Sequence, residues 1–127
     1  MPKPKKSTIY PTGSPNHAQH ISELMLEKKA QDILIMDIRT ITTLTDYFVI
    51  CTSESDPQTR AITNHINDRM KETGIKSWHT EGYQNLEWVL IDFVNIVVHI
   101  FSKEARKYYE FERLWADGNI IHVKDEE

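Results

Sequence analysis

The sequence predicts a single α/β domain in which a mixed β-sheet is flanked by helices. Its length of 127 residues is enough to bury one hydrophobic core. Short apolar runs rich in β-branched residues alternate with longer segments of helical periodicity. The expected order is helix, two strands, helix, three strands and helix, which is typical of helices packed on a mixed sheet.

The first three elements follow from local signals. Ser14 and Pro15 are typical of a helix start, and the helix is expected to end near Ala30. Two buried strands should follow, DILIMDI at 32–38 and YFVICT at 47–52, because both runs are apolar and rich in β-branched or aromatic residues.

The next helix has the clearest predicted boundaries. Asp56 is a suitable N-cap, Pro57 suits the first helical position, and Gly74 suits a helix end. Between them an apolar stripe repeats at intervals of four residues and predicts the buried face. It consists of Ile62, Ile66 and Met70, and Ala61 lies beside it.

A short third strand is expected at 77–80, followed by a hairpin at 87–101 with the sequence EWVLIDFVNIVVHIF. A turn at Val94-Asn95 makes the side chains of the two strands alternate between two faces. One face is wholly apolar and is expected to be core: Val89, Ile91, Phe93, Ile96, Val98 and Ile100. The other carries Trp88, Leu90, Asp92, Val97, His99 and Phe101.

Asp92 and His99 therefore share a face as diagonal neighbours, with Cβ atoms about 7 Å apart. An acid can orient an imidazole for catalysis, but the imidazole then needs a nucleophile or a substrate proton. The sequence has no Gly-x-Ser-x-Gly elbow, and Cys51 lies in an apolar strand where an inert, packed thiol is expected. We therefore predict a polar contact between the two side chains and a structural His99.

Other arrangements offer little for metal or nucleotide chemistry. His17 and His20 are three residues apart, and no third ligand stands at a recognised spacing. Glu54 and Asp56 follow a strand, but the chain has no glycine-rich phosphate loop. No cofactor or metal is expected, and the chain is not expected to be an enzyme.

The ends of the chain are predicted to be tails around a domain at 15–118. Residues 1–14 are rich in Pro, Lys, Ser and Gly and suggest a flexible tail. Ser102 should cap a helix that runs to about Ala116, and residues 119–127 are expected to form a C-terminal tail.

Charge and composition narrow the partners. A net charge of −4 argues against strong direct binding of nucleic acid, which needs Lys and Arg to neutralise phosphates. No apolar run approaches the ~20 residues that span a bilayer. One cysteine and the absence of a signal-like start favour a reducing, cytoplasmic location. A protein or a small molecule is the expected partner.

Five segments resemble the ribosomal silencing factor family, also called the Iojap-like family. They are DYFVI at 46–50, EG at 81–82, EWVLID at 87–92, VVHIF at 97–101 and YYEFERLW at 108–115. Their order and spacing extend the resemblance over about residues 20–116.

The resemblance implies a factor that binds the large ribosomal subunit through its ribosomal protein fourteen, blocks joining of the small subunit and so represses translation. It also implies a nucleotidyltransferase-like fold without that enzyme's metal motifs, and a homodimer when free of the ribosome. The chain departs from the family pattern at Thr52-Ser53-Glu54-Ser55, where a glycine-containing loop is usual, and at Val94-Asn95, where Gly-Asp is usual.

The residues and the resemblance together predict a partner-binding site. Trp88 is the expected anchor, because aromatic side chains dominate interface energetics. Glu81 and Asp92 are expected to meet basic side chains of the partner. The full predicted set is Glu81, Gly82, Trp88, Asp92, Tyr109, Leu114 and Trp115. The alternatives are a nucleotidyltransferase-like enzyme with a degenerate metal site, and a plain dimeric scaffold.

Overall fold

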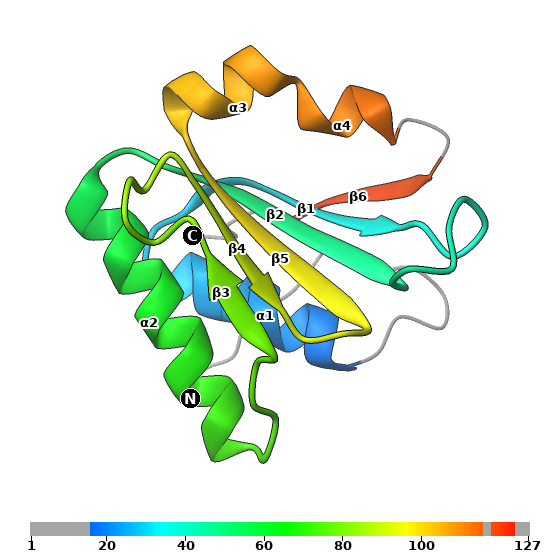
Figure 1. The fold of residues 1–127 in the computed structure, drawn as a ribbon, viewed down its shortest axis with the longest axis horizontal. Coiled ribbons are helices and arrows are strands. Elements are labelled where there is room, and N and C mark those ends of the chain that lie inside the picture. Colours follow the sequence, from blue (N-terminus) through cyan, green and yellow to red (C-terminus); the bar gives the residue numbers. More distant parts are fainter. Residues whose placement is uncertain (1–15, 116–117, 124–127) are drawn as a thin grey trace.

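The computed structural model describes residues 16–115 and 118–123, which form a six-stranded sheet with helices on both faces (Figure 1). The elements in chain order are α1 (Asn16–Glu27), β1 (Gln31–Asp37), β2 (Tyr47–Ser53), α2 (Asp56–Glu72), β3 (His79–Glu81), β4 (Trp88–Asp92), β5 (Ile96–Ser102), α3 (Lys103–Tyr109), α4 (Phe111–Leu114) and β6 (Asn119–Val123). The strand order is β3-β4-β5-β2-β1-β6.

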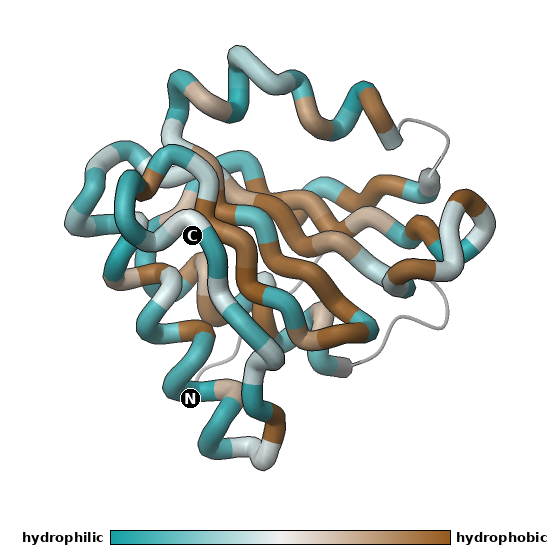
Figure 2. The backbone as a smooth tube through the Cα atoms, in the orientation of Figure 1, coloured by the Kyte–Doolittle hydropathy of each residue, from teal (hydrophilic) through white to brown (hydrophobic). Residues whose placement is uncertain are grey.

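The sheet is mixed, as the sequence predicts. β2 and β5 run parallel, and every other neighbouring pair runs antiparallel. All seven residues of β2 are buried, because this strand lies inside the sheet with a core on each face. Figure 2 shows the hydrophobic segments concentrated in the strands. The predicted α/β class is confirmed.

The first core fills the space between the sheet and the α1–α2 layer. Ile62, Ile66 and Met70 of α2 are buried, as the four-residue spacing predicts. They pack with α1 residues such as Ile21 and Met25 against the apolar face of the hairpin. The hairpin residues of that face are buried at Val89, Ile91, Ile96, Val98 and Ile100, and Phe93 is half-buried.

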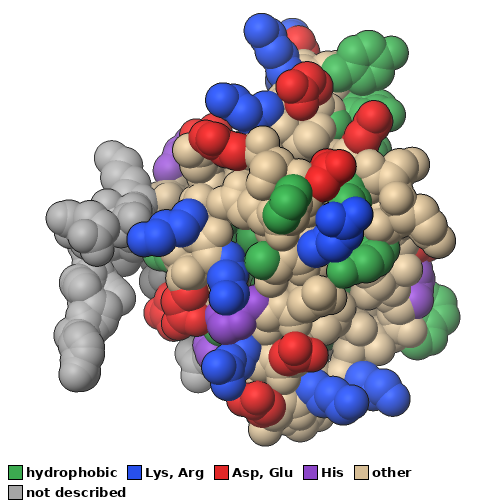
Figure 3. All heavy atoms as spheres, turned by 90° about the vertical axis from the view of Figure 1, so that its left-hand side faces the viewer, with side chains coloured by type: hydrophobic (Ala, Val, Ile, Leu, Met, Phe, Trp, Pro, Cys, Tyr) green, Lys and Arg blue, Asp and Glu red, His purple; other side chains and the backbone are tan. Residues whose placement is uncertain are grey.

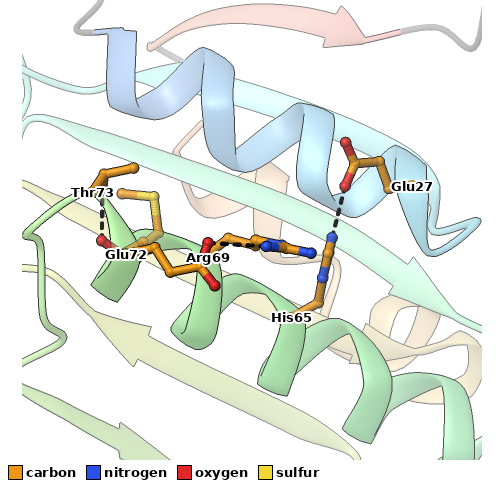
Figure 4. A network of polar contacts seen from close by, with 6 residues as sticks. Glu27, His65, Arg69, Glu72 and Thr73 are labelled. Carbon is orange, nitrogen blue, oxygen red and sulfur yellow. Dashed lines mark hydrogen bonds and ion pairs between the residues drawn. The ribbon is translucent and has the colours of Figure 1, made fainter.

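Polar contacts at the surface of the α1–α2 layer are a minor supplement to this burial. The His65 imidazole of α2 lies 2.7 Å from a carboxylate oxygen of Glu27 on α1, and Arg69 pairs with Glu72 along α2 (Figure 4). Exposed pairs of this kind contribute at most about 1 kcal/mol each, so apolar burial is the main attachment of these helices.

A second core lies on the opposite face of the sheet, which α3 and α4 cover (Figure 1). Its buried side chains are Leu34, Met36, Ile38, Phe48, Ile50, Phe101, Ala105 and Phe111. The face of the hairpin that carries Trp88 and His99 therefore belongs partly to a hydrophobic core and partly to the molecular surface.

The start of α2 differs from the prediction by one residue. Ser55, not Asp56, is the N-cap: its backbone is extended and its hydroxyl accepts a hydrogen bond from the Gln58 N–H at 3.2 Å. Asp56 is the first helical residue, and Pro57 lies in the first turn. Gly74, with φ of +90°, follows the helix end as expected.

The predicted C-terminal tail is wrong for residues 119–123, because they form β6 and pair antiparallel with β1. Ile120 packs against the second core and Ile121 against the first, so the strand closes both cores at this edge. The apolar pattern of residues 119–123 is limited to two adjacent isoleucines and a valine, which is too short to distinguish a strand from a tail by sequence. The predicted N-terminal tail, with the helix start at Ser14, lies outside the described residues.

The predicted helix from Ser102 to Ala116 is interrupted. Ser102 caps α3 as expected, since its hydroxyl accepts from the Ala105 N–H at 3.1 Å. Glu110 then adopts a left-handed conformation with φ of 48° and separates α3 from α4. This break turns the chain so that Phe111 enters the second core. Elsewhere the predicted ends shift by a few residues: α1 ends at Glu27, and β3 occupies His79–Glu81.

Candidate partner-binding site

The hairpin of β4 and β5 has the predicted register. Trp88 pairs with Phe101, Leu90 with His99, and Asp92 with Val97. Its turn contains Val94 with φ of 77°, a backbone conformation in which a β-branched residue is strained. Asp92 holds this turn, because its carboxylate accepts a hydrogen bond from the Val94 N–H at 2.7 Å.

The predicted contact between Asp92 and His99 is wrong. The Trp88 Nε1–H donates to His99 Nδ1 at 3.0 Å instead. Trp88 and Asp92 are both diagonal neighbours of His99 across the hairpin, so register alone allows either contact. The Asp92 carboxylate is engaged by the turn, whereas the indole N–H of a packed tryptophan needs an acceptor nearby.

His99 has a structural position, as predicted. Its side chain is 3% exposed and surrounded by aromatic rings, with centroids 4.8 Å away for Phe48 and 4.5 Å for Phe111. Burial in this apolar setting lowers the pKa of His99 to about 3, so the ring is neutral near neutral pH. A neutral ring that accepts at Nδ1 carries its proton on Nε2.

This burial predicts a pH dependence of stability. The folded-state pKa of about 3 lies below the ordinary value of 6.5, so the contribution is complete above pH 6.5 and is lost as pH falls toward 3. We expect His99 to reduce the free energy of unfolding by up to about 1.4 kcal/mol per pH unit within that window. Urea unfolding between pH 7 and about pH 4 measures the slope.

His99→Gln is the matched variant, because an amide oxygen can still accept from Trp88 while the titrating ring is gone. Its unfolding free energy should fall less steeply with acid than that of the wild type. Identical slopes in the two proteins would show that His99 is accessible to protons in the folded state.

Trp88 stands where the second core meets the surface. It is half-buried and packs on Phe101 at a centroid distance of 4.9 Å, on Tyr109 at 5.0 Å and on Phe111 at 5.6 Å. Its indole nitrogen is occupied by His99, so the ring rather than the N–H is available to a partner.

A cleft of about 330 Å³ opens beside Trp88, and we call it the Trp88 cleft. Its lining residues are Glu81, Gly82, Asn85, Glu87, Trp88, Leu90 and Tyr109. Four of the seven predicted site residues therefore come together in one place, although they derive from β3, the β3–β4 connection, β4 and α3. The two lining carboxylates, of Glu81 and Glu87, are exposed.

Gly82 allows the chain to pass close beside Trp88. Its φ is +83°, and a Cβ at this position would lie 2.1 Å from the Trp88 carbonyl oxygen. No side chain fits at that distance, so the backbone of the β3–β4 connection requires glycine here.

The remaining three predicted residues lie elsewhere. Asp92 and Trp115 line a neighbouring pocket of about 470 Å³, which we call the aromatic pocket, and Leu90 lines both depressions. Leu114 is 74% exposed on α4 and lines neither of them.

Sequence reasoning did not include Trp78, which is 73% exposed and lines the rim of the aromatic pocket with Leu44. Trp78 directly precedes β3. The strand predicted at 77–80 contains it, but the sequence did not predict which face of the sheet its side chain occupies. A tryptophan in a short strand is as compatible with core as with surface, so the sequence carried no signal for its exposure.

Catalytic and metal-binding arrangements gain no support from the geometry. Among residues 16–115 and 118–123, no group of three potential ligand side chains is placed to hold a metal ion. Cys51 is fully buried and the burial raises the pKa of its thiol to about 12, as expected for a packed residue. No helix within the described ranges is long and apolar enough to cross a membrane.

The chain is thus a mixed α/β domain whose surface carries an aromatic and acidic cleft at Trp88. A family model described as "Ribosomal silencing factor during starvation" matches residues 11–127. The chain is 44% identical over 97 residues to the ribosomal silencing factor of Bacillus subtilis (strain 168), covering 76% of this chain and 82% of that protein. It is also 29% identical over 106 residues to the chloroplastic protein Iojap of Zea mays, covering 84% of this chain and 46% of that protein.

Solved structures have the same fold. A crystal structure of a Chromobacterium violaceum protein superposes with a TM-score of 0.77 at 31% identity, covering 80% of this chain and 84% of that one. A second, from Bacillus halodurans, gives a TM-score of 0.71 at 34% identity, covering 84% and 95%. The chain belongs to the ribosomal silencing factor family, a family of translation regulators and not of enzymes. The predicted family is confirmed, and the alternative of a degenerate nucleotidyltransferase is set aside.

Proposed function

We propose that this factor binds the large ribosomal subunit through its ribosomal protein fourteen, prevents the small subunit from joining and thereby represses translation. The observation that carries the proposal is the Trp88 cleft, where Glu81, Gly82, Trp88 and Tyr109 converge. These residues come from segments that resemble the family, and their convergence in one cleft supports the proposal.

The chemistry of the cleft suits a basic protein surface. Part of the Trp88 ring is exposed, and contacts with neighbouring rings hold the buried part in place. Tyr109, which is 45% exposed, packs on the same ring. Rigid aromatic side chains of this kind lose little entropy on binding and often supply most of an interface's energy. Glu81 and Glu87 at the same cleft would attract Lys or Arg of the partner and accelerate association.

The net charge and the mixed charges on one face of the molecule (Figure 3) favour a protein rather than a bare nucleic acid as the direct contact. The face shown in Figure 3, on the left in Figure 1, carries acidic and basic side chains interspersed with small hydrophobic areas. With a net charge of −4, the chain is poorly suited to neutralise phosphates over a broad surface. A contact limited to one basic ribosomal protein avoids that repulsion.

Silencing by this route needs no bond to be made or broken. A factor that occupies a joining surface excludes the other subunit sterically, and its effect depends on affinity and concentration alone. We further propose that the factor acts in the cytoplasm and is a homodimer when free of the ribosome. A molar mass of about twice the 14.9 kDa of one chain, measured by light scattering, would support the dimer, and a monomeric mass would exclude it.

The test of the binding face is co-sedimentation with isolated large subunits. We expect Tyr109→Ala to weaken binding about tenfold, or ~1.4 kcal/mol, because it removes one aromatic wall of the Trp88 cleft. Tyr108→Ala is the matched control: Tyr108 is the adjacent residue, is 80% exposed and does not line this cleft, so its loss should change affinity by less than about twofold.

Thermal unfolding of both variants shows whether the fold is retained. A folded Tyr109→Ala protein that sediments with wild-type affinity would remove the Trp88 cleft from the interface. If the wild-type protein binds large subunits but does not affect subunit joining, the proposed partner stands and the blocking mechanism is refuted.

A further inference from the structure

The rim of the aromatic pocket is an exposed hydrophobic patch. Seven large hydrophobic side chains of the described residues are exposed, and three of them, Leu44, Trp78 and Val94, line this one pocket. Phe48 and Trp115 continue the hydrophobic lining toward the interior. Apolar side chains that are exposed together usually mark a surface that another segment or another molecule covers.

The pocket opens at one end of the sheet. Leu44 belongs to the connection between β1 and β2, and Val94 belongs to the turn between β4 and β5. The two connections are adjacent, because the Asp46 N–H donates to the Asn95 carbonyl at 3.0 Å. A segment that covers the pocket must therefore approach from this end of the sheet.

Helix α1 begins at this same end of the sheet. Residues 28–30 alone separate α1 from β1, and the two elements run in opposite directions (Figure 1). The first residue of α1, Asn16, is therefore at the end of the sheet where β1 finishes and the β1–β2 connection begins. Residues 1–15 of the sequence thus join the described fold at the end where the pocket opens, although α1 covers the opposite face.

The N-terminal segment is long enough to reach the pocket. Tyr10 precedes Asn16 by six residues, and six residues span up to about 20 Å when extended. Neighbouring layers of a fold are about 10 Å apart. The pocket lies between the sheet and α4, so the path from the α1 layer past the end of the sheet is less than two layers.

The composition of residues 1–15 suits an aromatic groove. Four of the five prolines of the chain belong to this segment, at positions 2, 4, 11 and 15. Proline-rich segments are typical ligands of aromatic-lined grooves, because a fixed φ leaves less conformational entropy to lose on docking. Ile9 and Tyr10, directly before Pro11, add an apolar run with one aromatic ring.

Charge favours the same pairing. Residues 1–15 contain Lys3, Lys5 and Lys6 and no acidic residue. Asp92 is the one charged residue among the described lining of the pocket, and Asp46 is exposed on the adjoining connection. Opposite charges around an apolar contact orient the approaching segment and speed its association.

We propose that residues 8–11 of the same chain occupy the aromatic pocket, with Tyr10 as the anchor and the preceding lysines near Asp92. Tyr10 packs on the aromatic lining, and the docked segment covers the exposed rim. Because a short tether holds the segment at a millimolar effective concentration, it fills the pocket ahead of the same segment from a second copy. The contact does not involve the Trp88 cleft.

Paramagnetic relaxation in the full chain tests the docking. A nitroxide label is attached to a Ser7→Cys variant, and Cys51 stays unlabelled because its thiol is fully buried. We expect the label to broaden the amide signals of Leu44 and Val94 and the indole signal of Trp78 in a ¹H–¹⁵N spectrum.

The matched control adds Tyr10→Ser to the same labelled chain, because this change keeps the tether and the lysines and removes the anchor. The relaxation enhancement at the three signals should fall at least threefold. Leu44→Ser changes the pocket instead of the segment and should reduce the enhancement at Val94 and Trp78 at least threefold as well. Leu44 is 85% exposed, so the fold should be retained, and unchanged signals in α2 check this.

Equal enhancement with and without Tyr10→Ser would overturn the proposal, since tethering alone would then explain the broadening. A mixture of spin-labelled chains without ¹⁵N and ¹⁵N-labelled wild-type chains tests for the other occupant. Broadening of the same three signals in this mixture would place the segment of a second copy in the pocket and overturn the intramolecular contact. Unbroadened signals in the mixture, together with the threefold loss in the control, would support it. No ribosomal subunit is present, so the outcome is independent of the proposed function.

Discussion

Gly82→Ala should lower the free energy of unfolding by about 3–5 kcal/mol, enough to leave much of the protein unfolded at physiological temperature. Two costs combine at this position. A left-handed φ of +83° costs any L-residue about 1–2 kcal/mol. In addition, the new Cβ would lie 2.1 Å from the Trp88 carbonyl oxygen, so the β3–β4 connection must move away from β4. Urea denaturation followed by circular dichroism measures the change.

Gly74→Ala separates the two costs. Gly74 has φ of +90°, but a Cβ there would meet no atom within 4 Å. This variant should therefore lose only about 1–2 kcal/mol, the price of the backbone conformation alone. Equal losses in the two variants would show that the close approach to Trp88 relaxes without cost, and that Gly82 is needed for its conformation only.

Trp88→Ala should weaken large-subunit binding by at least about 2 kcal/mol, some thirtyfold, and lower stability by about 3 kcal/mol as well. The loss of binding follows from the Trp88 cleft, of which the indole forms one wall. The loss of stability follows from the core side of the same ring, which packs on Phe101, Tyr109 and Phe111 and donates to His99. Co-sedimentation and thermal unfolding on the same protein separate the two effects.

Trp78→Ala is the matched control for Trp88→Ala, since Trp78 is 73% exposed and does not line the Trp88 cleft. It should change stability by less than about 0.5 kcal/mol. Trp88→Ala protein that is folded at the assay temperature and sediments at wild-type affinity would exclude Trp88 from the interface.

The regular parts of this fold were predictable because their sequence patterns are long or strict. Strict alternation in 87–101 leaves one register that buries the aliphatic face, and the structure has that register. The α2 stripe and Gly74 likewise fix the buried side and the end of that helix. In each case several residues agree, so one ambiguous position does not change the result.

Features that depend on single residues were missed. The helix predicted over 102–116 contains no glycine or proline that would signal its break at Glu110. The break accompanies the burial of Phe111 in the second core. For the candidate site, the sequence predicted only part of how the side chains are arranged, and the site itself stays a prediction. The segments that resemble the family include Glu81, Gly82, Trp88 and Tyr109, and these four residues line one cleft. The hydrogen-bond partner of His99 was missed, because the strand register places Trp88 and Asp92 equally close to it and does not show which side chain bonds.

The pairing of β6 with β1 has a consequence for how the chain acquires its fold during synthesis. β1 is made early, but one of its two edges is completed only by residues 119–123. While the chain is growing, the backbone groups along that edge of β1 are unpaired beside the apolar side chains of Ile33 and Ile35. Long-range closures of this kind are slow steps in folding. The sheet can therefore close only after residues 119–123 have been synthesised, and until then the open edge of β1 can mispair with another chain.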